Sequence, residues 1–161
     1  TGWLNELAFI PVDANPVAMR DEWSLDIGCG VKYFSQDSVI KLAPAAGIEL
    51  DGALSPAEKL KAVQALMNEG DGRAAAIYRS IGVYLAHSLA LYHNMYHFRH
   101  VLLLGRVMSG RGGELIISEC ERVLRDEYSE LAEKIHLALP DEKFRRVGQS
   151  AAAASLPEIK K

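Results

Sequence analysis

The chain has 161 residues, of which 49% are hydrophobic and 24% are charged, and its formal net charge is −3. This length is sufficient for one globular domain with its own core. The acidic balance argues against an electrostatic nucleic-acid interface, and no apolar run approaches the roughly 18 residues that a membrane-spanning helix needs. We therefore expect neither a membrane nor a direct nucleic-acid partner.

Two further features bear on where the protein works. Cys29 and Cys120 make no disulfide framework and the sequence shows no signal-peptide pattern, so a cytoplasmic location is expected. The chain begins with Thr1 and runs quickly into an apolar segment. We interpret that beginning as a cut inside a larger protein.

The first 46 residues carry the weakest structural signals. Residues 7–12 (LAFIPV) predict a strand that ends at Pro11 and at a polar turn over residues 13–16. Residues 17–30 keep no hydrophobic period and are interpreted as a loop. Residues 33–46 are weakly helical.

Two clear helices follow. Ser55, Pro56 and Glu58 form a capping box with proline at the first helical position, which predicts a helix to about Asn68. After a glycine break, Asp71 can cap a second and much longer helix. Apolar residues mark one face of that helix and small residues its other faces, which predicts burial on several sides. The residues that mark the apolar face are Ile77, Ile81, Leu85, Leu89 and Tyr92.

A strand–helix–strand unit comes next. Residues 101–104 (VLLL) predict a buried strand, residues 112–127 a helix, and residues 134–139 a second strand with alternating polarity. Because such a unit crosses over through its helix, the two strands are expected to lie parallel in one sheet. A last helix of small residues is predicted over residues 147–156.

Glycines gather just after the first strand of this unit, at Gly105, Gly110, Gly112 and Gly113. At the carboxyl end of a buried strand, such a turn lets backbone approach a phosphate or nucleotide, and the next helix offers N–H groups. However, the turn matches neither a P-loop nor a G-x-G-x-x-G motif. The alternative is that Gly105 only lets strand and helix meet tightly and that the turn is flexible, and both interpretations stay open.

The histidines suggest a metal site at first sight. On an unbroken helix, His93, His97 and His100 would share one face, as metal ligands do. The helix has to end near residues 94–99 for the strand to begin, and no cysteine or carboxylate joins the three. We interpret them as a polar helix end and predict no metal site. Cys29, standing alone between two glycines, cannot build a structural zinc site.

Five segments follow one another in the order of a known family's motifs. Residues 5–12 (NELAFIPV) look like G-E-x-G-H-x-P-V, and residues 28–35 (GCGVKYFS) look like G-C-x-E-x-Y-x-S. Residues 75–92 are similar to a long helix before the nucleotide site, residues 103–107 (LLGRV) to x-G-G-G-V, and residues 147–154 to a last small-residue helix. The chain thus resembles the C-terminal half of the ROK family of sugar kinases and related regulators.

This resemblance implies an α/β fold, an RNase H-like lobe of the actin-type ATPases with a mixed sheet and helices on both faces. The lobe would be a single domain over residues 1–157, with a tail over residues 158–161. In the family, an aspartate of the other lobe deprotonates a sugar hydroxyl, which attacks the γ-phosphate of Mg-ATP. The implied partners are therefore a missing N-terminal lobe of the same protein, a sugar ligand and further copies of the chain. No catalytic residue is expected within this chain.

The resemblance also implies roles for a few side chains and for ATP with Mg²⁺ in the parent protein. Glu6 would contact sugar hydroxyls, and Gly105 would lie against the nucleotide. The remaining residues assigned to the nucleotide are Arg106, Gly110, Gly112 and Gly113.

Departures from the family pattern leave two functions open. Phe9 stands where the family has a histidine that helps to bind sugar or zinc, and Arg106 stands in place of a glycine. Of the family's zinc cysteines only Cys29 remains, so zinc is not expected, and Val31 replaces a glutamate. The chain is either one lobe of a working ATP-dependent sugar kinase or a degenerate, non-catalytic ROK-like module for ligand sensing or assembly. The losses favour the second.

Overall fold

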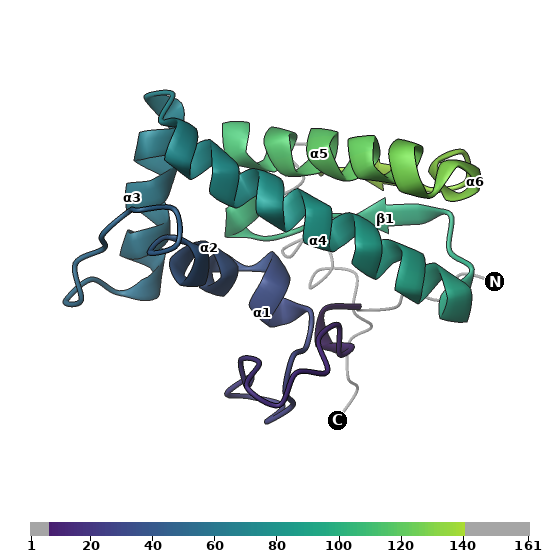
Figure 1. Ribbon diagram of the computed structural model, residues 1–161, viewed down its shortest axis with the longest axis horizontal. Coiled ribbons are helices and arrows are strands. Elements are labelled where there is room, and N and C mark those ends of the chain that lie inside the picture. Colours follow the sequence, from purple (N-terminus) through teal and green to yellow (C-terminus); the bar gives the residue numbers. More distant parts are fainter. Residues whose placement is uncertain (1–6, 141–161) are drawn as a thin grey trace, which may run out of the picture.

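The computed structural model describes residues 7–140, and over that range the chain is mainly helical with one small parallel sheet. Glu6, the predicted helix over residues 147–156 and the tail lie outside the described residues. The elements in chain order are η1 (Leu7–Phe9), α1 (Val31–Phe34), α2 (Gln36–Leu42), α3 (Pro56–Asn68), α4 (Gly72–Tyr96), β1 (His100–Leu102), η2 (Arg106–Met108), α5 (Arg111–Glu127), α6 (Ser129–Ala132) and β2 (His136–Ala138) (Figure 1).

The long helix α4 runs through the middle of the molecule, and α5 packs beside it along the upper edge of the view (Figure 1). Their backbones come close at Gly82, where a Cβ atom would stand 2.7 Å from the carbonyl oxygen of Ile116. Around this contact the two helices bury the apolar faces that the sequence predicts. The main core residues of the pair are Ile77, Ile81, Leu85 and Leu89 from α4, and Ile116, Cys120, Val123 and Leu124 from α5.

The predicted helix starts at Ser55 and Asp71 are confirmed. The Ser55 hydroxyl accepts a hydrogen bond from the backbone N–H of Glu58 at 3.4 Å, and the Glu58 carboxylate accepts one from the N–H of Ser55 at 2.9 Å. At the start of α4, the Asp71 carboxylate accepts from the N–H of Arg73 at 2.8 Å. These caps satisfy N–H groups that have no partner inside the helix.

The prediction of parallel strands is confirmed, although the strands are shorter than expected. In β1 and β2 the pairs are His100 with His136, Val101 with Leu137 and Leu102 with Ala138. The prediction that residues 101–104 are buried is wrong, because Leu102 is 57% exposed and Leu104 is 63% exposed. Successive strand residues point to opposite faces, and within residues 7–140 nothing covers the face on which these leucines lie.

The strand predicted over residues 7–12 is also wrong. Leu7–Phe9 form a 3₁₀ turn closed by a hydrogen bond from Ile10 N–H to the Leu7 carbonyl oxygen at 3.1 Å, and Pro11 makes only an isolated antiparallel bridge with Cys29. Proline has no N–H to donate to a ladder, so it interrupts pairing where the alternation of apolar residues suggested a strand.

The loop predicted over residues 17–30 is confirmed as lacking helices, and it is tied to the helical body by Lys32. This side chain is only 4% exposed, and its ammonium group lies 2.8 Å from an Asp37 oxygen, 3.9 Å from an Asp21 oxygen and in contact with Glu22. Burial alone would lower the pKa of Lys32, but its hydrogen bonds to Asp37 and Glu22 outweigh burial and raise it. The weakly helical stretch after it divides into α1 and α2 at Ser35.

No helix among residues 7–140 is long and apolar enough to cross a bilayer.

Candidate functional site

The predicted glycine turn connects β1 to the N-terminus of α5. Gly105 has φ +113° and precedes η2, and Gly110 has φ +63° and precedes α5. Both values are in the region that favours glycine, and a Cβ atom at either position would meet nothing within 4 Å. These two glycines are therefore required by the path of the backbone, with open space beside them.

Gly112 and Gly113 serve a different purpose, because both are buried. A Cβ atom on Gly112 would stand 2.5 Å from Cε1 of the Tyr78 ring, and one on Gly113 would collide with the Met108 carbonyl. At these two positions, glycine is therefore explained by tight packing between the elements rather than by the approach of a ligand. The first turn of α5 can pack this tightly against α4 and η2 only because both residues lack a side chain.

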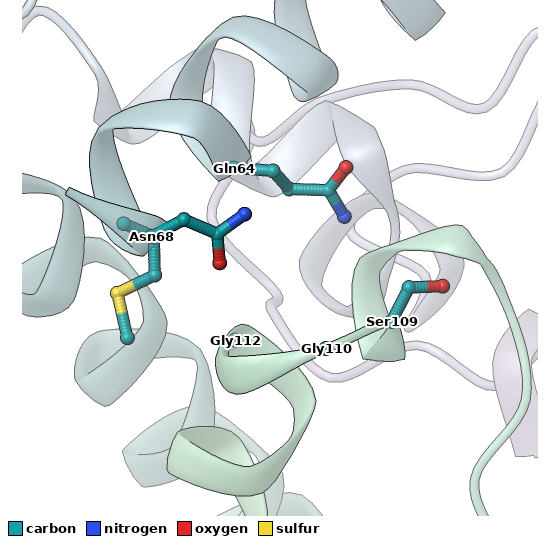
Figure 2. Close-up of a pocket in the computed structure, with 6 residues that line it drawn as sticks. Gln64, Asn68, Ser109, Gly110 and Gly112 are labelled. Atoms are coloured by element: carbon teal, nitrogen blue, oxygen red, sulfur yellow. The ribbon is translucent and has the colours of Figure 1, made fainter.

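A shallow cavity of about 190 Å³ lies between α3 and the start of α5, and we call it the α5 cavity. Gln64 and Asn68 extend from α3 over the turn that contains Ser109 and Gly110 (Figure 2). The Gln64 amide donates to the Arg106 carbonyl oxygen at 3.0 Å, which joins α3 to η2. The cavity is lined by Gln64, Met67, Asn68, Ser109, Gly110 and Gly112.

The electrostatics of the α5 cavity favour an anion. The carbonyl oxygen of Gly110 accepts from the N–H groups of Gly113 at 3.1 Å and Glu114 at 3.5 Å, which places the positive end of α5 at the cavity. Arg111 adds a cation that reaches the Asn68 carbonyl oxygen at 3.5 Å. The residues that line the cavity include no carboxylate, imidazole or thiol. The cavity can thus bind a phosphate group, but its lining offers no general base.

The structure brings together only part of the predicted site. Gly110 and Gly112 line the cavity and Gly113 lies buried in the first turn of α5. Gly105 and Arg106 do not line it, although the Arg106 carbonyl oxygen accepts a hydrogen bond from the Gln64 amide. The sequence analysis missed Gln64 and Asn68. Their i, i+4 spacing predicts that both side chains lie on one face of α3. The neighbouring sequence does not predict that this face contacts the glycine turn.

The histidines form a second hollow, of about 390 Å³, which we call the histidine cavity. As predicted, α4 ends between residues 94 and 99, at Tyr96, and His97 follows in a left-handed conformation with φ 50°. His100 is not among the residues that line this cavity, but its ring stacks on that of His136 at a centroid distance of 5.4 Å. The cavity is lined by His93, His97, Arg99, Glu133, Lys134 and His136.

Within residues 7–140, no group of three or more histidine, cysteine, aspartate or glutamate side chains is arranged to hold a metal ion. Cys29 and Cys120 are both buried and free. Burial raises the pKa of the Cys29 thiol and raises that of Cys120 to about 12, so both are poor nucleophiles at neutral pH. His87, in the middle of α4, pairs its Nδ1 with the Tyr128 hydroxyl at 2.8 Å.

No protein-family model, curated protein or solved structure matches this chain.

Proposed function

We propose that the chain is the C-terminal lobe of a ROK-like, sugar kinase-related protein and that its α5 cavity receives the phosphates of an adenine nucleotide. The observation that carries this proposal is the path from the parallel strand β1 through Gly105 and Gly110 to the N-terminus of α5. In α/β proteins, ligands bind at the carboxyl ends of parallel strands, where the following helix presents its N–H groups.

The residues at the cavity suit a phosphate better than a metal ion. The amide groups of Gln64 and Asn68, the N-terminus of α5 and the Arg111 guanidinium are donors or positive charges. Mg²⁺ requires oxygen ligands, usually a carboxylate together with the phosphates themselves. Since no carboxylate lines the cavity, this chain would hold the nucleotide and the other lobe would supply the metal ligands and the catalytic base.

A degenerate module that binds a nucleotide without catalysis is the second candidate. It is favoured by the small size of the α5 cavity and by the exposed Arg106 side chain next to Gly105, where the resemblance implies a further glycine. In that function, binding would stabilise the contact of α3 with η2 and α5 through Gln64. Sensing or assembly would then depend on nucleotide occupancy alone.

Calorimetry with Mg-ATP tests nucleotide binding, with Asn68→Leu as the variant and Asn94→Leu as the matched control. Both asparagines are exposed on helices, but only Asn68 lines the α5 cavity. We expect Asn68→Leu to weaken binding by roughly tenfold and Asn94→Leu to leave it unchanged. An absence of heat with ATP, with or without sugar, would exclude both candidates. Transfer of the γ-phosphate to a sugar by the two-lobed protein separates the kinase from the degenerate module.

A further inference from the structure

We propose that the histidine cavity is a second site, which binds a small phosphate-bearing anion such as pyrophosphate or a phosphate monoester. The cavity is about 390 Å³ in volume, against about 190 Å³ for the α5 cavity. Five of its six lining residues carry a cationic or imidazole side chain, and Glu133 is the single acidic one. The cavity lies at the end of α4 and the beginnings of the two strands, away from the glycine turn.

Arg99 is the main anchor for the anion. Among residues 7–140, its guanidinium has no hydrogen-bond or ion-pair partner, although its backbone carbonyl accepts from His136 N–H at 2.7 Å. A guanidinium group presents a planar fork that matches two phosphate oxygens. Lys134 adds a second cation, held only loosely by Glu130 at 4.0 Å. Both cations are therefore available to a ligand.

His93 and His97 add imidazole rings to the cavity. The Nδ1 atom of His93 lies 3.1 Å from the Phe98 carbonyl oxygen, and because a carbonyl only accepts, Nδ1 carries the proton. Nε2 can then donate to an anion only when the ring gains a second proton. The His97 ring packs edge-on against His93 at 5.7 Å and lines the same cavity. Both rings therefore add ring nitrogens to the polar lining of the cavity.

The residues that line the cavity carry two formal cations, Arg99 and Lys134, against one carboxylate, Glu133. The strands add His100, which stacks on the lining residue His136. The segment before β2 adds Glu133 in the lining and Glu130 beside Lys134. Two carboxylates thus oppose an arginine, a lysine and the surrounding imidazoles. This composition recognises an anion, and the histidines are not arranged as a cation site within residues 7–140.

Calorimetry with inorganic pyrophosphate on the full chain at pH 6 tests this site. We expect binding that Arg99→Gln weakens by about tenfold, with Lys134→Gln acting in the same direction. Arg125→Gln is the matched control, because Arg125 is exposed on α5 and contacts only Glu121 at 3.9 Å within the described part of the chain. Asn68→Leu should leave unchanged the binding that depends on Arg99, which separates this site from the α5 cavity.

A second arm uses sulfate, followed by the NMR signals of the histidine rings. Sulfate should shift these signals in the wild type and bind roughly tenfold more weakly to Arg99→Gln. Three results would overturn the proposal. They are no binding of pyrophosphate at pH 6, an equal loss in Arg99→Gln and Arg125→Gln, and a loss in Asn68→Leu with none in Arg99→Gln.

Discussion

The ring of Tyr78 lies so close to Gly112 that a Cβ atom on the glycine would stand 2.5 Å from the ring atom Cε1. Tyr78 is fully buried, so its ring cannot move aside into solvent. We therefore expect Gly112→Ala to lower the free energy of unfolding by about 1–3 kcal/mol, the usual cost of overfilling a packed core. Urea denaturation followed by circular dichroism measures this loss.

Gly72→Ala is the control for that substitution. Gly72 is the first residue of α4, and a Cβ atom there would meet nothing within 4 Å. Alanine favours the helix and restricts the unfolded chain, so stability should rise slightly, by up to about 1 kcal/mol. Equal losses in the two variants would show that packing against Tyr78 is not the cause.

The Tyr78 hydroxyl leads to a second prediction. It is buried and has no hydrogen-bond partner within residues 7–140, and burial raises the pKa of Tyr78 to about 12. Tyr78→Phe removes a desolvated polar group without breaking a hydrogen bond. The free energy of unfolding should stay the same or increase by about 1 kcal/mol. A clear loss in the same denaturation experiment would reveal a partner for this hydroxyl.

Lys32 should be important for stability although it lies near the surface loops. Its side chain is 4% exposed, and its ammonium group contacts Asp37 and lies near the almost fully buried Asp21, so Lys32→Met would leave carboxylates without their cation. Removing one partner of a buried ion pair costs about 3–5 kcal/mol, and we expect a loss near the lower end because Asp37 is partly exposed. Thermal denaturation checks this.

Lys61→Met is the matched control for Lys32→Met. Lys61 is exposed on α3 and should tolerate the change within about 0.5 kcal/mol. Similar losses in both variants would mean that the ion pairs of Lys32 add nothing specific.

The loop around Asp21 should give the protein a measurable acid sensitivity. The N–H groups of Ser24 and Trp23 donate to the Asp21 carboxylate at 2.7 and 3.2 Å, and the first of these bonds is the main cause that lowers its pKa. Because the pKa of this carboxyl is lower in the folded state than in the unfolded state, its ionised form stabilises the fold. This contribution to the free energy of unfolding is fully present above the unfolded-state pKa of about 3.9 and is lost as the pH falls through the folded-state pKa.

The urea concentration at the midpoint of unfolding should therefore decrease in the wild type once the pH falls below about 4. In Asp21→Asn this decrease should be smaller. The comparison is made at pH 6, 4 and 3 (approximate steps around the unfolded pKa). Asp13, whose pKa is lowered mainly by its hydrogen bond with Tyr33, contributes in the same direction and remains in the variant. An identical acid loss in both proteins would contradict the role given to Asp21.

The sequence was sufficient to predict the elements that have strong local signals. The capping box at Ser55 and the cap at Asp71 place two helix starts correctly, and the apolar period of α4 identifies its buried face. The parallel pairing of β1 with β2 follows from the strand–helix–strand order alone. These features depend on residues that are close together in the chain, so they can be predicted from a single sequence.

Features that depend on tertiary contacts were not predictable. An apolar run such as residues 101–104 does not show whether a further layer covers it, and Leu102 and Leu104 are exposed. The contact of Gly112 with Tyr78 and the position of Gln64 over the glycine turn each join segments more than 30 residues apart. Local sequence patterns do not determine such contacts. The sequence therefore predicts a glycine turn between β1 and α5, but it does not predict which glycines have positive φ and which pack closely against a neighbour.

The backbone N–H groups at the start of α5 offer the most direct test of nucleotide binding. In a ¹H–¹⁵N NMR titration with ADP, the signals of Gly110, Arg111 and Gly112 should shift together with the side-chain amides of Gln64 and Asn68. Signals in the middle of α4, around Tyr84, should stay in place because that part of the helix lines neither cavity. Shifts confined to the histidine cavity, or no shifts at all, would contradict a nucleotide site at the N-terminus of α5.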